Sequence, residues 1–155
     1  MIELRDEPAG GPAARELFGE YIQLVRERSG IADFAPVERI FASEDAFAAD
    51  GGAFIVAYLG GAAVGCGGLR PLAPGVAEIK RMFVAAPARG RGVGRRLLHA
   101  LEARAAAAGH TRVLLLTTPM LGEASALYAA EGYREIERVD PGGGRPVEVW
   151  LEKRL

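Results

Sequence analysis

The chain has 155 residues, half of them apolar, and a formal net charge of −1. This length suits one domain with one hydrophobic core, so we expect a single domain over residues 1–155. The balance of 19 basic and 20 acidic residues argues against the basic field of a nucleic-acid-binding protein. One cysteine excludes an intrachain disulfide, and only two histidines argue against a metal centre. No apolar run reaches the about 20 residues of a membrane span, and residues 1–5 lack a signal peptide's apolar centre, so we expect a soluble, cytoplasmic protein.

The first third of the chain predicts one strand followed by helices. Residues 2–5 alternate like a strand, and residues 13–28 have one apolar helical face before Ser29-Gly30 ends the helix. Residues 31–50 are less regular and predict a second helical stretch with five acidic residues against one arginine. The first helix is expected to be a scaffold helix, with an apolar face formed by Leu17, Tyr21, Leu24 and Val25.

A glycine pair predicts a hairpin in the next segment. Residues 53–59 and 62–69 have the composition of strands, and Gly60-Gly61 between them can supply the positive φ values of a tight turn. The return strand contains three glycines, which allow close packing or a bulge, at Gly65, Gly67 and Gly68.

Residues 78–109 predict a strand, a glycine-arginine turn and a helix. The strand is Glu78 to Val84, and alternation predicts that Glu78 shares a face with Lys80, Met82 and Val84. Apolar residues at helical spacing follow, and Gly109 stands where a C-terminal glycine would end the helix.

The turn itself, Arg89-Gly90-Arg91-Gly92-Val93-Gly94, has the chemistry of an anion site. Glycines let backbone N–H groups converge, and the start of the next helix adds unpaired donors and the positive end of its dipole. Guanidinium groups beside the turn match phosphate oxygens. A nucleotide triphosphatase loop would need Gly-Lys followed by Ser or Thr, and a dinucleotide fold would need G-x-G-x-x-G. The turn has neither pattern.

The remaining segments complete a mixed α/β fold. We expect a buried strand over 112–118, a helix over 123–131, a strand over 133–139 and a last strand over 146–152. With the earlier elements, these predict a central, mostly antiparallel sheet of six or seven strands flanked by about four helices.

Two motifs in this order resemble those of the GNAT superfamily of N-acetyltransferases. Arg89-x-x-Gly92-x-Gly94 is similar to the superfamily's acyl-CoA signature. Downstream, Ala124-x-x-Leu127-Tyr128-x-x-x-Gly132-Tyr133 resembles its later helix with a tyrosine and a Gly-aromatic exit. The resemblance covers about residues 53–153 and implies a GNAT-like fold, a coenzyme A ligand and no metal.

By this resemblance, the turn's amides hold the pyrophosphate of coenzyme A, and the preceding strand pairs with the pantetheine arm. The implied cofactor-binding residues are Met82, Phe83, Val84, Arg89, Gly90, Arg91, Gly92, Val93, Gly94 and Arg95.

The resemblance also implies two catalytic residues. Glu78 corresponds to a catalytic glutamate of several family members, acting directly or through water, although an ordinary surface carboxylate or a partner for Lys80 is the alternative. Tyr128 corresponds to the tyrosine that protonates the departing sulfur, although it could be a core aromatic. The backbone N–H of Val84 is the candidate to polarise the carbonyl.

The expected function is therefore acetyl-CoA-dependent N-acetylation by direct attack of a primary amine in a ternary complex. The acceptor is a small amine, a protein lysine or an N-terminus, and the acidic residues within 31–50 are either a solvated surface or a wall that favours a cationic amine. A non-catalytic acyl-CoA sensor or interaction module is the alternative. Members of the superfamily often form homodimers, and nothing in the sequence marks an interface.

Overall fold

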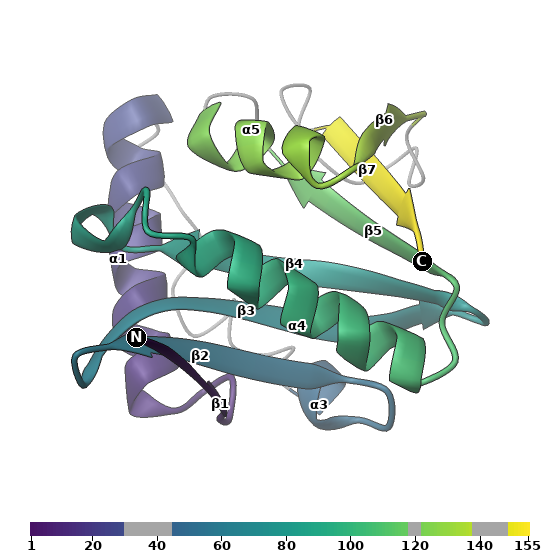
Figure 1. Ribbon diagram of the computed structural model, residues 1–155, viewed down its shortest axis with the longest axis horizontal. Coiled ribbons are helices and arrows are strands. Elements are labelled where there is room, and N and C mark those ends of the chain that lie inside the picture. Colours follow the sequence, from purple (N-terminus) through teal and green to yellow (C-terminus); the bar gives the residue numbers. More distant parts are fainter. Residues whose placement is uncertain (30–44, 118–121, 138–148) are drawn as a thin grey trace.

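A computed structural model describes residues 1–29, 45–117, 122–137 and 149–155 of the chain. Seven strands form one sheet in the order β1-β2-β3-β4-β5-β7-β6 (Figure 1). Neighbouring strands are antiparallel except β4 and β5, which are parallel. The strands are β1 (Ile2–Asp6), β2 (Ala53–Leu59), β3 (Ala62–Ala73), β4 (Val76–Val84), β5 (Arg112–Thr117), β6 (Arg134–Ile136) and β7 (Val149–Arg154).

Four helices lie on the two faces of this sheet within the described part of the chain. Helix α4 (Val93–Ala107) packs on β2, β3 and β4 from one face, together with α5 (Gly122–Ala130). Helices α1 (Pro12–Ser29) and α3 (Asp45–Ala48) pack from the other face. In Figure 1, α4 crosses in front of the sheet and α1 stands behind it. A single 3-10 turn, η1 (Ala86–Ala88), joins β4 to the segment before α4.

Each face has its own hydrophobic cluster. The α4 face buries Leu97, Leu98 and Leu101 against Ile55 and Ile79 of the sheet. The α1 face is smaller and includes two aromatic residues from the sheet, two apolar residues from the helices and the cysteine, namely Phe54, Phe83, Leu17, Phe47 and Cys66. The alternation of strand residues between these clusters fixes which side chains can reach each face.

The pairing of β4 with β5 stops before β4 ends. The parallel ladder runs from Val76 opposite Arg112 to Ile79 opposite Leu115, whereas β4 continues to Val84. Figure 1 shows the two strands diverging beyond this point. The last part of β4 therefore has an open edge on the β5 side within the described residues.

The predicted alternation along β4 is wrong beyond Lys80. Between the pairs Cys66–Phe83 and Gly68–Lys80 the register shifts by one residue, and Arg81 has a φ of 58°. This is a β-bulge, in which one extra residue in β4 moves every later side chain to the other face. Met82 and Val84 consequently pack on the α4 side, opposite to the face of Glu78 and Lys80.

Most of the predicted elements are confirmed, and so is the mixed α/β fold class. Gly60 and Gly61 form the hairpin turn with φ values of 60° and 82°. The strand predicted over 133–139 is observed as β6, and the last strand, predicted over 146–152, is observed as β7; residues 138–148 lie outside the described part of the chain. The helical stretch predicted over 31–50 is described only from residue 45, where α3 forms, and its earlier part lies outside the described residues. No helix in the described ranges is long and apolar enough to cross a membrane.

One buried carboxylate joins the last three strands of the sheet. Glu152 of β7 is 3% exposed and lies opposite Leu114 of β5 and Arg134 of β6. Its oxygens accept hydrogen bonds from Arg112 Nε at 2.5 Å and Arg134 Nη2 at 2.7 Å. The Arg134 and Arg112 hydrogen bonds hold the pKa of Glu152 below its ordinary value of 4.5.

Replacing this carboxylate should destabilise the fold in a pH-dependent way. We expect Glu152→Gln to lower the free energy of unfolding by about 2 kcal/mol at pH 7, because charged hydrogen bonds are lost at a buried site. Because the folded pKa is lowered, the stabilisation is complete above 4.5 and disappears as the pH falls through the folded value. Urea unfolding at several pH values measures this, with exposed Glu135→Gln on β6 as the control. Equal stability of Glu152→Gln and the wild type at pH 7 would contradict it.

Candidate active site

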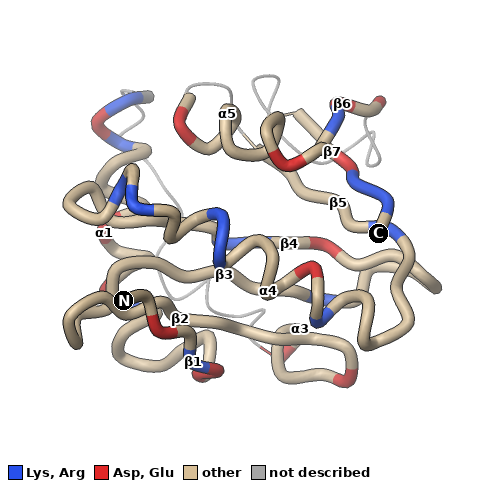
Figure 2. The backbone as a smooth tube through the Cα atoms, viewed as in Figure 1, with Lys and Arg blue, Asp and Glu red and all other residues tan. Residues whose placement is uncertain are grey.

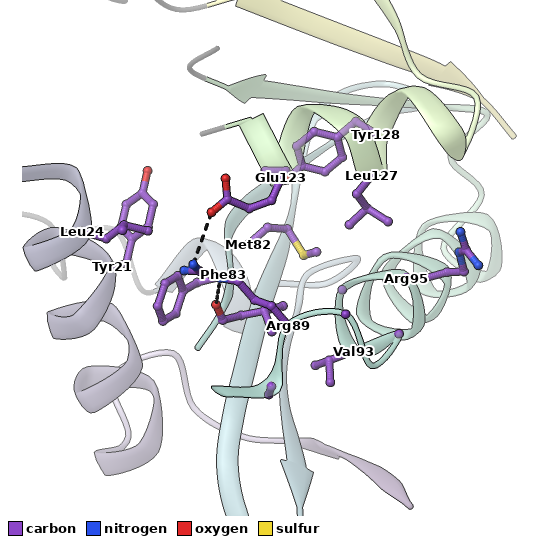
Figure 3. A pocket seen from close by; sticks show the side chains of 16 residues that line it. Tyr21, Leu24, Met82, Phe83, Arg89, Val93, Arg95, Glu123, Leu127 and Tyr128 are labelled. Atoms are coloured by element: carbon purple, nitrogen blue, oxygen red, sulfur yellow. Dashed lines mark hydrogen bonds and ion pairs between the residues drawn. The ribbon is translucent and has the colours of Figure 1, made fainter. Parts of the chain in front are cut away.

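A pocket of about 400 Å³ lies where β4 loses its partner strand. It is bounded by α1, the end of β4, the glycine-arginine turn, the start of α4, and α5. Figure 3 shows side chains from all of these elements around it. The predicted strand residues Met82, Phe83 and Val84 line it together with Tyr128, so residues distant in the sequence meet here.

The glycine-arginine turn presents open backbone at the pocket. Gly90 and Gly92 have φ values of 76° and 81°, which side chains rarely adopt. Gly92 is the N-cap of α4, and within the described structure no side chain caps this helix. The first N–H groups of α4 are therefore available to an anion, as the sequence predicted for a phosphate.

Gly94 brings α4 and α5 together. A Cβ atom at Gly94 would lie 2.9 Å from Cδ2 of Leu127 and 3.6 Å from Cγ2 of Val84. The helix start thus packs closely against α5 and β4. Gly90, Gly92, Val93 and Gly94 all line the pocket.

The arginines of the turn have different surroundings. Arg89 donates from Nε to the carbonyl of Val84 at 3.1 Å and pairs with Glu123 at 3.3 Å. Arg95 pairs with Glu131 at 2.6 Å, and Arg96 donates to the carbonyl of Ile2 at 3.1 Å. Arg91 is exposed and does not line the pocket. The guanidinium of Arg89 thus holds the turn on β4 and α5, a contact that the sequence did not suggest.

Glu123 at the start of α5 forms an ion cluster at the pocket. Its two oxygens accept hydrogen bonds from Arg28 of α1 at 2.7 and 3.0 Å, and Arg89 approaches from the turn. The hydrogen bonds from Arg28 contribute most to lowering the pKa of Glu123 to about 2. In Figure 2, the acidic start of α5 lies on the same side of the molecule as the basic end of α1 and the arginine turn. Three segments are therefore joined by charge beside the pocket.

Tyr128 lies at the inner wall of the pocket. It is 5% exposed, and its ring meets that of Tyr133 edge-on at 5.8 Å. Burial, with a smaller contribution from Tyr21, raises the pKa of Tyr128 above its ordinary value. The phenol therefore keeps its proton at neutral pH. The structure thus brings Tyr128 together with the turn and the open end of β4.

Glu78 does not line this pocket. It lies in the stretch of β4 that is still paired with β5, opposite Leu114, and is 3% exposed. Arg70 of β3 donates from Nε to Glu78 at 2.6 Å. The ion-pair partner of Glu78 is therefore Arg70. The sequence had offered an exposed surface position or Lys80 as partner, and the structure shows neither.

The other reactive side chains lie away from the pocket. Burial raises the pKa of the Cys66 thiol to about 12, and its Sγ donates to the carbonyl of Arg81 at 3.4 Å. Cys66 is therefore buried and unreactive, as expected. Across the residues that the structure describes, no cluster of three or more His, Cys, Asp or Glu side chains could hold a metal ion.

Four pocket residues were not predicted from the sequence, and one of them is Ala88 of η1. Among the other three, Tyr21 and Leu24 of α1 belong to the helix face that the sequence marked only as scaffold, and Glu123 had no motif position. The helical spacing of Tyr21 and Leu24 and the single acidic residue Glu123 did not indicate a functional site. Only the packing of α1 beside β4 and α5 brings them to the pocket.

A family model described as "Acetyltransferase (GNAT) family" matches residues 14–133. The chain belongs to this family. An "IAA acetyltransferase" of Azospirillum brasilense is 40% identical over 103 residues, which are 66% of this chain and 67% of that protein. The membership confirms the resemblance seen in the two motifs and the expected class of enzyme, an acetyltransferase.

Solved structures share the fold over the full chain. A GNAT acetyltransferase from Staphylococcus aureus superposes with a TM-score of 0.80 at 20% identity, covering 99% of each chain. A GNAT family acetyltransferase from Elizabethkingia anophelis, solved with acetyl-CoA bound, gives a TM-score of 0.67 at 20% identity, covering 99% of this chain and 98% of that one. These similarities confirm the mixed α/β fold with its mostly antiparallel sheet.

A side chain at Gly92 should weaken the binding of acetyl-CoA without unfolding the protein. We expect Gly92→Val to weaken the binding of acetyl-CoA by about tenfold or more, because the left-handed backbone that exposes the α4 amides is strained by a side chain. Calorimetric titration with acetyl-CoA measures this. Gly60→Val is the matched control, since Gly60 also has a positive φ and has no atom within 4 Å of an added Cβ, but lies in the hairpin. Unchanged affinity of the Gly92 variant would contradict a phosphate site here.

Proposed function

We propose that this acetyltransferase moves an acetyl group from acetyl-CoA to a primary amine by direct attack in a ternary complex. The observation that carries the proposal is the meeting of three features in one pocket. These are the open edge of β4, the uncapped turn at Gly92 and the side chain of Tyr128. The open strand edge suits an extended ligand, and the uncapped turn suits a phosphate. The hydroxyl of Tyr128 suits a leaving group that needs a proton.

The pocket's own residues would bind the cofactor along one path. The amides of Gly92, Val93 and Gly94 would hold the pyrophosphate, and the backbone of β4 from Met82 to Val84 would pair with the pantetheine arm as a strand would. The acetyl-CoA bound to the Elizabethkingia relative supports the same choice of cofactor. Arg89 would fix the turn through Val84 and Glu123.

Acetyl-CoA would supply a thioester, whose C–S bond breaks as the amine nitrogen bonds to the carbonyl carbon, leaving an amide and a thiolate. Tyr128 would donate its proton to the thiolate. Its raised pKa keeps the phenol protonated before the reaction, as a proton donor must be. The N–H of Val84 would polarise the carbonyl oxygen. No covalent enzyme intermediate is needed, because the described pocket offers no cysteine or activated serine to form one.

Glu78 would remove the proton from the amine through water. Glu78 is not among the residues that line the pocket, which favours a water relay over direct contact. Arg70 would hold the carboxylate oxygen in place at 2.6 Å. The whole of residues 1–155 would act as one catalytic domain, with a small amine, a lysine or an N-terminus as the acceptor.

Removing the Tyr128 hydroxyl should slow the chemical step. We expect Tyr128→Phe to lower kcat by about 100-fold, the usual contribution of a general acid, with the Kd for acetyl-CoA unchanged. Coenzyme A release with a panel of amines, amino acids, polyamines and lysine peptides measures kcat. Tyr133→Phe is the control, because it removes a buried hydroxyl that instead bonds Glu102 at 2.9 Å. A kcat equal to that of the wild type would show that Tyr128 is only a core aromatic.

The role of Glu78 can be separated from that of its ion pair. We expect Glu78→Gln to lower kcat/KM by about 100-fold, whereas Arg70→Gln, which breaks the same pair, should lower it far less. Thermal unfolding of both variants reports the loss of stability that they share. Equal losses of activity in the two variants would show that the ion pair has a structural role. Another group would then have to act as the base.

The sensor alternative predicts a different result. Wild-type protein that binds acetyl-CoA but releases no coenzyme A with any acceptor in the panel would favour a non-catalytic module. The position of Tyr128 within the pocket favours the enzyme.

A further inference from the structure

The pocket has two ends that differ in chemistry. At one end lie the turn, the start of α4 and Leu127 of α5, where backbone amides are open. At the other end lie Tyr21 and Leu24 of α1, on the opposite face of the sheet from α4. A cofactor whose phosphates occupy the first end leaves the second for the acceptor.

Tyr21 is held firmly at this second end. Its ring meets Phe83 edge-on, with centroids 5.9 Å apart, and Phe18 at 5.7 Å. Phe83 belongs to β4 and faces α1 because of the bulge at Arg81. The bulge therefore gives the tyrosine ring its packing partner. A ring fixed on two sides presents its hydroxyl from a defined position.

Tyr21 and Tyr128 stand on opposite sides of the pocket, with Met82 and Glu123 between them (Figure 3). Both tyrosines line the same pocket, so a molecule within it can lie between the two side chains. Of the two described α1 residues that line the pocket, Leu24 is apolar and only Tyr21 has a polar group. A molecule that enters from α1 therefore meets the polar group of Tyr21 on the side of the pocket opposite Tyr128.

We infer that Tyr21 positions the acceptor amine, its hydroxyl oxygen accepting a hydrogen bond from an amine N–H so that the nitrogen lone pair faces the acetyl carbon. This inference rests on the proposed function and adds a residue to it. Tyr21 is a positioning residue and exchanges no proton with the substrate. Because it binds the amine before and during the reaction, its contribution is to acceptor affinity and little to the rate of the chemical step.

The test is Tyr21→Phe, which keeps the ring and its contacts with Phe83 and Phe18. With an acceptor found in the amine panel, we expect KM for the amine to rise about tenfold, the ratio contributed by one ordinary hydrogen bond, with kcat changed less than about twofold. The Kd for acetyl-CoA should not change. Tyr58→Phe is the matched control, because its hydroxyl bonds Glu7 and does not line the pocket.

The outcomes separate this role from others. An unchanged KM for the amine, or a weaker Kd for acetyl-CoA, would overturn the inference while leaving the proposed function in place. A fall in kcat with unchanged KM would also overturn it, since that pattern belongs to a proton donor such as Tyr128. Wild-type protein that turns over no acceptor would overturn the proposed function and with it the role of Tyr21.

Discussion

The early end of the ladder between β4 and β5 is the constraint on which the site depends. Beyond Ile79 the strand keeps its partner β3 on one side and loses β5 on the other. A strand edge with unpaired backbone groups invites another extended chain, which natural proteins normally prevent. Here the edge is enclosed by α4, α5 and α1, so that only a slender ligand can use it. The opening of the sheet thus becomes a pocket instead of a surface for aggregation.

The bulge at Arg81 decides which side chains meet at that pocket. One extra residue turns Met82 and Val84 toward α4 and Phe83 toward α1. Without it, Phe83 would lie under α4 and the aromatic contact with Tyr21 would not form. The cost of a positive φ in a residue with a side chain, of order 1 to 3 kcal/mol, is thus offset by contacts on both faces.

The sequence predicted the turn, the long helix and the hairpin well because each has local chemistry. Glycine at Gly60, Gly92 and Gly109 indicates positive φ values, and all three have them. The bulge had no such signal, because Arg81 is not a residue that favours a left-handed backbone. The face of Met82 was therefore predicted wrongly. Alternation assumes an unbroken ladder, and the glycines of β3 that allow a bulge do not indicate which residue of β4 is the extra one.

The candidate site was predictable only where motifs marked it. Tyr128 and the glycine turn, which the motifs marked, line the pocket, whereas Glu78 lies outside its lining with Arg70 as partner. The contributions of Tyr21 and Glu123 come from segments about 100 residues apart in sequence, joined by the ion pair of Arg28 with Glu123. Such contacts arise from tertiary packing, which one sequence does not encode in any short pattern.

The ion cluster at the pocket has a consequence for how a ligand arrives. Arg28 and Arg89 outnumber Glu123, and exposed Arg91 lies nearby, so this patch is positive on a chain whose net charge is −1. A ligand with several phosphate charges would be drawn toward this one place during diffusion. The attraction would act on the rate of encounter and weaken as salt shortens the screening length toward about 8 Å. The rate of departure would depend instead on the contacts within the pocket. The association rate and the dissociation rate of the ligand would therefore depend on different features of the same surface.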